Sequence, residues 1–302
     1  MTEIAPNLVF LEKVKSKVDK TIKFIFLSQG QVIELSYINK DDGKDIICAP
    51  TQTACNLGCK FCFLSDYNLA VRNLTPEEIL FTTDYVINNL NLLIQQKHNR
   101  ILLISFRGCG EPLRNIKNVI DSSNRVRDKY HKDYDVVRFA VASLIPKIKL
   151  MQKFTDEIKK YKLPLKFHLS LHSADSKTRK SLMPSASSIA ESIILTEFFM
   201  KYTDNSAEIH YSMIEGVNDR EEDLAKLIYL LKNRGIPVKF LVYNEKPSVN
   251  FKGSPRIDYF RVSLESEGIT TEFYNPPGAD IGSSCGQFLM DYYEKYSKKE
   301  KK

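Results

Sequence analysis

Three closely spaced cysteines constrain this chain more than any other feature. Cys55, Cys59 and Cys62 form a C-x3-C-x2-C motif in a loop-like stretch. Three thiolates this close together suit a [4Fe–4S] cluster in which the protein binds three irons and the fourth stays open for chemistry. A structural zinc site requires four ligands, normally in two pairs, and no fourth Cys or His lies nearby in the sequence. Three unconnected buried thiols are the remaining alternative.

The length and composition indicate a globular protein of one large domain or two small ones. The chain has 302 residues, of which 43% are hydrophobic and 27% charged, and α/β barrels of this size are often undivided. No apolar run approaches the roughly 18 residues that a membrane span needs, and the N-terminus lacks a secretion signal. Six cysteines in such a chain favour metal binding or catalysis over disulfides. We expect a cytoplasmic monomer without membrane association.

The charge distribution is mildly basic. The net charge of +7 is compatible with a polyanionic partner but does not require one. Residues 147–166 carry seven Lys against two acids, which predicts either a solvated helix face or a set of phosphate contacts. Residues 291–302 form a basic C-terminal tail, which we expect to be frayed and solvated.

Strand signals dominate the N-terminal part of the chain. Alternating apolar residues predict strands at 8–10, 20–27, 31–38 and 45–48, with Gln29-Gly30 and Asp42-Gly43 as turns. We therefore expect a small β-hairpin extension over residues 1–44 that leads into the cysteine motif.

Helices and strands alternate after the cysteine motif. Thr75 with Glu78 predicts a capping box that opens a helix to about residue 97, and Asn218 with Glu221 predicts another. Gly235 and Gly268 occupy positions where helices are expected to end. Further helices are expected after 113 and at 147–161, 187–203, 219–234 and 256–267, and strands at 100–106, 136–143, 164–170, 208–214, 237–243 and 270–274. This pattern predicts an α/β fold, a partial (β/α)6 TIM-like barrel over residues 45–290, with chemistry at the C-terminal strand ends.

The motifs at these strand ends resemble a known family. The cysteine spacing, with Phe61 before the last cysteine, is typical of radical S-adenosylmethionine (SAM) enzymes. Over residues 30 to 290 the chain resembles the RlmN/Cfr family of radical SAM RNA methyltransferases. The matching pieces are Cys48-x3-Gln52-x2-Cys55-x3-Cys59-x2-Cys62, Gly110-Glu-Pro-Leu113, Ser170-Leu-His172, Leu182-Met-Pro184, Gly216-Val-Asn-Asp219 and Asp280-Ile-x3-Cys285-Gly-Gln287.

The resemblance implies a set of cofactor ligands. Cys55, Cys59 and Cys62 are then the ligands of the [4Fe–4S] cluster, and SAM chelates the open iron. Glu111 is expected to accept a hydrogen bond from the SAM ammonium, and two glycines beside it let backbone approach a ligand closely. The other SAM contacts implied by the family pattern are Gly110, Pro112, Ser143, Ser170, His172 and Asn244. For His172 alone, an ordinary strand-end histidine is the alternative.

The resemblance also implies two catalytic cysteines outside the cluster motif. In the family, one SAM methylates the residue at Cys285, the radical from a second SAM removes hydrogen from that methyl group, and the carbon radical adds to an adenine ring. Cys48 then forms the disulfide that releases the product. Glu34 lies near a family glutamate that removes the adenine proton, although a solvent-facing position on its strand is a competing expectation. Cys109 is expected to be a packed thiol.

Three departures from the family pattern bear on the substrate. Only about thirty residues precede the matching region, where the family carries an accessory helical domain. The strand end at Ala140-Val-Ala-Ser143 lacks one SAM-contacting hydroxyl, and Tyr274-Asn-Pro-Pro277 replaces arginines that suit phosphate. Ribosomal or transfer RNA is the favoured substrate, with a free adenine nucleotide as the alternative. A flavodoxin or ferredoxin is the expected reductant.

Two other functions remain open on sequence grounds. One is a radical SAM enzyme that acts directly on a small molecule or peptide. The other is a protein that holds an iron–sulfur cluster without catalysis. Cleavage of SAM to 5′-deoxyadenosine separates the second from any radical enzyme.

Overall fold

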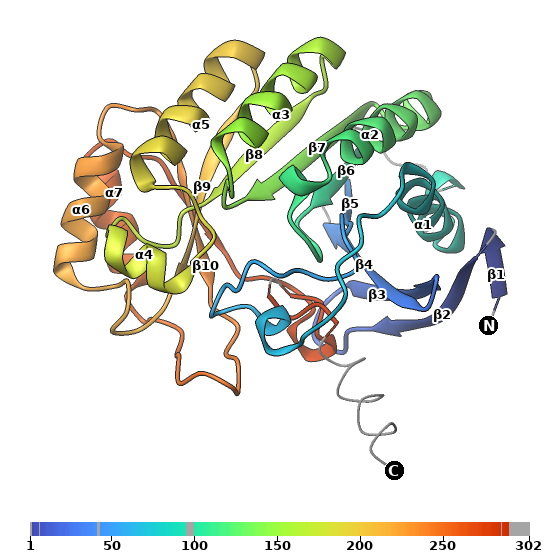
Figure 1. Ribbon diagram of the computed structural model, residues 1–302, viewed down its shortest axis with the longest axis horizontal. Coiled ribbons are helices and arrows are strands. Elements are labelled where there is room, and N and C mark those ends of the chain that lie inside the picture. The colour runs from blue at the N-terminus through green and yellow to red at the C-terminus, as the bar shows by residue number, and fades with distance from the viewer. Residues whose placement is uncertain (1, 6, 41–42, 95–99, 285, 290–302) are drawn as a thin grey trace.

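One curved sheet organises the molecule. The structure is a computed structural model that describes residues 2–5, 7–40, 43–94, 100–284 and 286–289. Within these ranges, all the strands belong to a single sheet whose spatial order follows the chain from β1 to β11. The first and last strands do not pair with each other, so the sheet is open (Figure 1).

The N-terminal strands form the antiparallel part of this sheet. They are β1 (Thr2–Ala5), β2 (Leu8–Lys15), β3 (Thr21–Ser28) and β4 (Gln31–Lys40). The sequence did not predict β1, and β2 is longer than expected. Strand β4 pairs antiparallel with β5, which in turn pairs parallel with β6. The β extension is therefore continuous with the barrel sheet, and the boundary expected after residue 44 falls at the first residue of β5.

The remaining strands are parallel and form the barrel wall. They are β5 (Lys44–Cys48), β6 (Ile101–Phe106), β7 (Val136–Ser143), β8 (Leu165–Ser170), β9 (Ala207–Met213), β10 (Val238–Val242) and β11 (Thr271–Tyr274). Each pairs parallel with its neighbour in the chain. Parallel neighbours joined by helical crossovers produce this arrangement. The predicted α/β class and partial barrel are confirmed.

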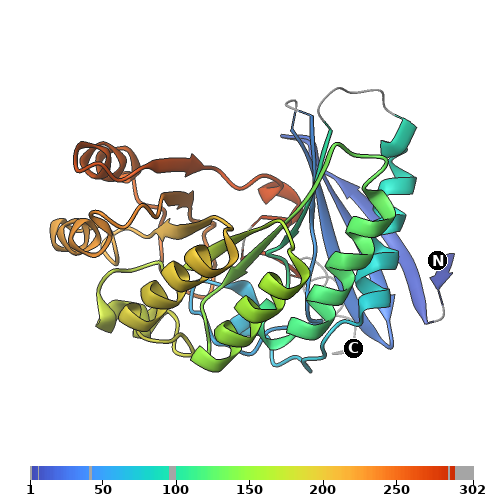
Figure 2. The same ribbon diagram turned by 90° about the horizontal axis from the view of Figure 1, so that it is seen from above.

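Helices line the outer side of the sheet, as Figures 1 and 2 show. They are α1 (Pro76–Asn89), α2 (Ile116–Tyr130), α3 (Ile148–Tyr161), α4 (Ser176–Leu182), α5 (Ile189–Thr203), α6 (Glu221–Leu231) and α7 (Ile257–Ser266). The short helix α4 was not predicted, and α1 ends before residue 97. No helix in the described ranges is long and apolar enough to cross a membrane.

The helix boundaries test the capping signals in the sequence. Thr75 accepts from the backbone N–H of Glu78 in the predicted capping box. The box predicted from Asn218 is wrong, because Arg220 caps α6 and the side chain of Asn218 binds backbone groups of other turns. The prediction that Gly235 ends a helix is also wrong, since α6 ends at Leu231. Gly268 directly follows the C-cap residue of α7, as predicted.

The two faces of the barrel strands have different composition. On β8, Phe167 and Leu169 face the helices and belong to the apolar core. The alternating residues Lys166, His168 and Ser170 face the concave side and line cavities. We call the space on this concave side the lumen. Because successive side chains of a strand point to opposite faces, the polar alternation shows a lumen that is not filled by an apolar core.

Candidate active site

The loop of residues 49–75, between β5 and α1, carries the cysteine motif, and we call it the cluster loop. The N–H of Cys62 donates to the carbonyl of Cys59 at 3.0 Å, and the N–H of Lys60 donates to Leu182 at 2.9 Å. These backbone bonds fold the loop over the C-terminal ends of the strands. The side chains of Cys55, Cys59 and Cys62 all line one cavity of about 180 Å³, the active-site cavity.

The spacing of the three thiols fits a cluster better than a single metal ion. Ligand atoms that share a tetrahedral zinc ion, each ~2.3 Å from the metal, lie within about 4 Å of one another. In the described ranges, the only group of three or more His, Cys, Asp or Glu ligand atoms within 4.8 Å contains none of these cysteines. A cubane spreads its thiolates over separate irons. The geometry therefore favours the predicted [4Fe–4S] ligands Cys55, Cys59 and Cys62.

Burial keeps the three thiols protonated in the absence of a bound cation. Burial raises the pKa of Cys62 to about 12, and it raises the pKa of Cys55 and of Cys59 as well. Ionised sulfur is therefore unfavourable here unless iron compensates the charge.

Lys246 ties the cluster loop to the segment after β10. Its ammonium is buried and donates to the carbonyls of Lys60 (3.2 Å) and Cys62 (3.0 Å) and to Ser65 Oγ (2.7 Å). It also pairs with Asp66 at 2.7 Å. The role of Lys246 is not visible in the sequence, because nothing in its neighbourhood indicates a partner 180 residues earlier.

The loop after β6 packs directly under the cluster loop. Gly110 has φ +100°, and a Cβ there would lie 2.8 Å from the backbone nitrogen of Gln52. A Cβ on Gly108 would lie 2.9 Å from the backbone of Ala49. The N–H of Glu111 donates to Gln52 Oε1 at 2.9 Å. The glycines were expected to let backbone approach a ligand, and in the structure the backbone they admit is that of the cluster loop.

Glu111 is a buried carboxyl group in the active-site cavity. Burial raises its pKa to about 7, although the Ser143 side chain and the N–H groups of Leu113 and Leu144 hydrogen-bond to it and lower it. No ion pair involves Glu111 in the described part of the chain. A buried carboxyl of this kind binds an ammonium favourably, because the incoming cation offsets the lost hydration. The residues present thus fit the amino group of SAM.

The other predicted SAM contacts converge on the same cavity with one exception. Gly110, Ser143, Ser170, His172 and Asn244 line it. Pro112 does not line it, and instead begins the 3-10 helix η3 (Pro112–Arg114) that Glu111 caps.

His172 is positioned by backbone contacts at the end of β8. It has φ +53°, and its Nδ1 accepts the N–H of Ser212 at 3.0 Å. Burial lowers the pKa of His172 to about 3, so the ring is neutral with its proton on Nε2. The buried guanidinium of Arg179 holds the same turn by donating to the carbonyls of Leu171 (3.2 Å) and Ser170 (3.3 Å). The ordinary strand-end alternative is thereby weakened, because the ring lies in the active-site cavity.

Of the three predicted catalytic residues, Cys48 and Glu34 lie in the described part of the chain, and they occupy different places. Cys48 is buried and lines a small second cavity together with Arg107, Tyr274 and Ser284, which we call the Cys48 cavity. Cys285 lies outside the described residues, as does the predicted tail at 291–302. Arg107 lines both the Cys48 cavity and the active-site cavity, so the two are adjacent.

Glu34 is neither solvent-facing nor in the active-site cavity. It is fully buried on the concave face of β4, so the solvent-facing expectation is wrong. Its carboxylate accepts the N–H of Leu289 at 2.7 Å and lies 3.9 Å from the ammonium of Lys23. Cys109 packs as expected in an apolar cluster, with Ile25 and Leu289.

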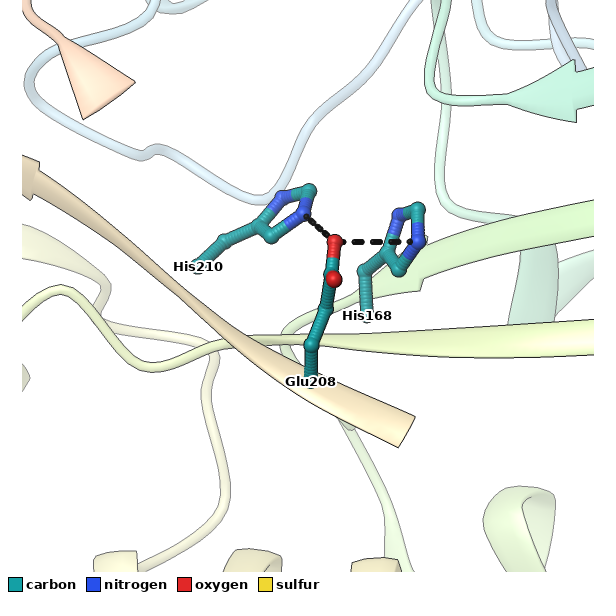
Figure 3. Close-up of side chains that lie close together, drawn as sticks. All are labelled: His168, Glu208 and His210. Atoms are coloured by element: carbon teal, nitrogen blue, oxygen red, sulfur yellow. Dashed lines mark hydrogen bonds and ion pairs between the residues drawn. The ribbon is translucent and has the colours of Figure 1, made fainter. Parts of the chain in front are cut away.

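Arg107 and a buried charged group in the lumen were missed by the sequence analysis. Glu208 Oε1 lies 3.0 Å from His210 Nε2 and 3.3 Å from His168 Nε2 (Figure 3). Lys239 and Lys166 also pair with this carboxylate. Two ammonium groups on the same carboxylate disfavour a divalent cation, so we read the group as a charge network rather than a metal site. The polar alternation on β8 and β9 was the signal for it.

Comparisons with known proteins agree with this geometry. No protein-family model matches the chain. A Clostridium novyi protein named "Probable dual-specificity RNA methyltransferase RlmN" is 31% identical over 296 residues, which are 95% of this chain and 80% of that protein. A protein of the same name from Clostridium botulinum is 32% identical over 290 residues, 93% of this chain and 78% of its own.

The chain belongs to the RlmN family. The crystal structure of a radical SAM methyltransferase from Sphaerobacter thermophilus superposes with a TM-score of 0.81 at 26% identity, over 93% of this chain and 81% of that one. The chain is thus an enzyme of the radical SAM methyltransferase class. The cofactors of that class are a [4Fe–4S] cluster and SAM, and the residues of the active-site cavity fit both.

Proposed function

We propose that this RlmN-family enzyme methylates an sp² carbon of an adenine ring, with RNA as the favoured substrate, through an S-methylcysteine at Cys285. The supporting observation is the position of Cys48. Its buried side chain lines the Cys48 cavity together with Tyr274 and Ser284. Ser284 is the residue directly before Cys285 in the chain, and the Cys48 cavity adjoins the active-site cavity. The names of the relatives support RNA as the substrate.

The proposed chemistry needs two SAM molecules for each product. An aromatic sp² carbon is too poor a nucleophile to take a methyl group directly, so a radical route is required. When bound, the cluster and SAM supply a 5′-deoxyadenosyl radical. Glu111 binds the ammonium of SAM, while Ser170, His172 and Asn244 orient it.

The chain's own thiols carry the group that is transferred. The Cys285 thiolate first accepts a methyl group from one SAM. That methyl group would then lose a hydrogen atom to the deoxyadenosyl radical and bond to the adenine carbon. The adduct is a radical, so it would lose the hydrogen of that carbon as a proton and one electron, which the oxidised cluster would take back, before the sulfur–carbon bond breaks. The sulfur of Cys48 attacks that of Cys285, the sulfur–carbon bond breaks, and the carbon leaves with the substrate and takes up a proton.

Glu34 has a more restricted role in this proposal than the sequence suggested. Its carboxylate is occupied by the N–H of Leu289 at 2.7 Å. Removal of the adenine proton by Glu34 requires a path to its carboxylate, which is fully buried and does not line the active-site cavity. In the described arrangement, Glu34 positions the segment 286–289 that follows Cys285.

The direct test is anaerobic incubation of reconstituted enzyme with methyl-labelled SAM, with total RNA and a nucleotide pool offered separately. We expect label on adenine in RNA, located by mass spectrometry. A Cys48→Ala variant should cleave SAM but retain the substrate on Cys285 as a covalent adduct of increased mass. Label on free nucleotide alone contradicts the RNA substrate. Normal turnover by Cys285→Ala contradicts the methylcysteine route.

A further inference from the structure

A large cavity occupies the lumen at the end opposite the cluster. Its volume is about 610 Å³, within the range of about 300–1,000 Å³ that is typical of small-ligand sites. It lies where the parallel strands begin, because its wall includes the first residues of β5 and β8 and the segment before β9. We call it the basic cavity.

The walls of the basic cavity are cationic. Its lining contains Lys44, Arg107, Arg138, Lys166 and Lys239, against only the acids Asp204 and Glu272. Each cation comes from a different strand or strand end, at an inward-facing position. The buried carboxylate of Glu208 forms ion pairs with Lys166 and Lys239, and Lys239 also pairs with Glu272. The cavity remains net positive with Glu208 included, so it favours an anion.

A buried polar atom without a partner provides a second, independent observation. His168 is 5% exposed and lines the basic cavity, and its Nδ1 has no hydrogen-bond partner in the described part of the chain. Its Nε2 points to Glu208 (Figure 3). Because the Nε2–H donates to the Glu208 carboxylate, Nδ1 is an acceptor, and leaving it unsatisfied costs free energy unless a water or a donor group of a ligand, such as a hydroxyl, binds it.

The basic cavity adjoins the Cys48 cavity and the active-site cavity through shared lining residues. Arg107 lines the basic cavity, the Cys48 cavity and the active-site cavity, and Tyr274 lines the first two. The Arg107 guanidinium lies 5.4 Å from the centre of the Tyr274 ring. An aromatic ring beside a guanidinium is a surface on which a nucleobase stacks. Arg107 and Tyr274 thus form the boundary between the basic cavity and the Cys48 cavity.

We propose that the basic cavity binds the phosphate of the substrate nucleotide while its base reaches past Arg107 and Tyr274 toward Cys48. Arg138 is the main exposed cation of this site, since it is exposed on β7 and forms no ion pair with any described residue. Lys44 and Lys166 complete the charge around the phosphate. The inference rests on the proposed function, because it takes the base to be the group that reacts.

The test compares ligands that differ only in phosphate. Binding of adenosine 5′-monophosphate, adenosine and a short RNA with a single adenosine is measured by calorimetry on the reconstituted enzyme, under nitrogen and without SAM. The variants are Arg138→Gln and the double change Lys44→Gln with Arg138→Gln. The matched control is Lys201→Gln, an exposed lysine of α5 outside the lumen and outside residues 147–166. Circular dichroism confirms that each variant is folded.

The nucleotide or the RNA should bind at least about tenfold more tightly than adenosine, and Arg138→Gln should remove about tenfold of that preference. Lys201→Gln should retain it. A preference shown by RNA alone identifies a backbone phosphate, and one shared by the monophosphate identifies a free nucleotide. Equal binding of all three ligands, or a preference unchanged in the double variant, overturns the proposal. Phosphate-dependent binding without any methyl transfer to adenine contradicts the proposed function but leaves the phosphate site intact.

Discussion

The two ends of the lumen are built by different means. At the C-terminal end, the cluster loop supplies three thiols from eight consecutive residues, and the loop after β6 packs against it through Gly108 and Gly110. At the N-terminal end, single residues from separate strands assemble a cationic wall. The first end depends on close backbone packing, whereas the second depends on the register of the sheet.

This difference has an energetic consequence. Removal of a residue from the cluster loop breaks contacts made by adjacent residues of the same loop. Removal of one cation from the basic cavity leaves the others in place, because each is held by its own strand. We therefore expect all-or-none effects at the C-terminal end and graded effects on ligand binding at the other.

The largest expected effect is at the cluster. Cys59→Ala should bind no complete [4Fe–4S] cluster and produce no 5′-deoxyadenosine, because two thiolates cannot replace three. Iron counting after anaerobic reconstitution and product analysis measure this. Cys109→Ala is the matched control, since Cys109 packs in an apolar cluster and should leave the iron content unchanged. A Cys59→Ala protein with full iron content contradicts the ligand assignment.

The next effect concerns the charge network that Glu208 forms with His168, His210, Lys166 and Lys239. Burial alone would raise the pKa of Glu208, but the hydrogen bond from His210 and the nearby His168 and Lys239 hold it well below its ordinary value. Glu208→Gln removes a buried carboxylate from the partly exposed Lys166 and from Lys239, which keeps Glu272, and should cost ~2–3 kcal/mol of unfolding free energy. Denaturant unfolding measures the loss. SAM affinity should remain within about twofold of wild type if the two ends are independent.

A backbone test addresses the packing at the C-terminal end. Gly110→Ala places a Cβ 2.6 Å from the Gln52 side chain and holds alanine at φ +100°. Strain of ~1–3 kcal/mol at such a φ, together with overpacking of similar size, should loosen the cluster loop. Gly253→Ala is the control, because its nearest neighbour would be 3.8 Å away. Equal thermal stability and iron content in both variants would show that this packing is dispensable.

The smallest effect concerns the carboxyl group of Glu111. Its pKa of about 7 lies above the ordinary 4.5, so the folded cluster-free protein binds the proton more tightly than the unfolded chain. Its contribution to stability is complete below about pH 4.5 and is lost as the pH rises through 7, by up to roughly 3 kcal/mol. Glu111→Gln should abolish that loss and weaken SAM binding about tenfold or more.

Unfolding of the cluster-free protein between pH 5 and 8, and SAM titration of the reconstituted enzyme, measure the two effects of Glu111→Gln. Wild-type SAM affinity should increase from pH 6 to 7.5, as Glu111 ionises, and the affinity of the variant should not. Parallel pH profiles for the two proteins would show that Glu111 does not bind the ammonium.

Sequence alone determined the features that depend on neighbouring residues. The thiol spacing at Cys55, Cys59 and Cys62 and the capping box at Thr75 are local, so their chemistry is readable without a fold. The alternation of strands and helices was sufficient to predict a parallel, partial barrel, because parallel strands require crossovers between them. Most of the predicted SAM contacts also converged, since each follows a strand and parallel strands end at one edge.

Tertiary structure decided what depends on pairing between distant strands. Glu34 is buried rather than solvent-facing because segment 286–289 covers it, and Asn218 binds backbone turns instead of capping α6. Arg107 connects three cavities, although its own sequence neighbourhood shows only a strand end. The polar alternation on β8 and β9 was visible in the sequence, but which face it occupied was not. Sheet register and curvature place these side chains in one lumen, and those properties depend on packing across the whole chain.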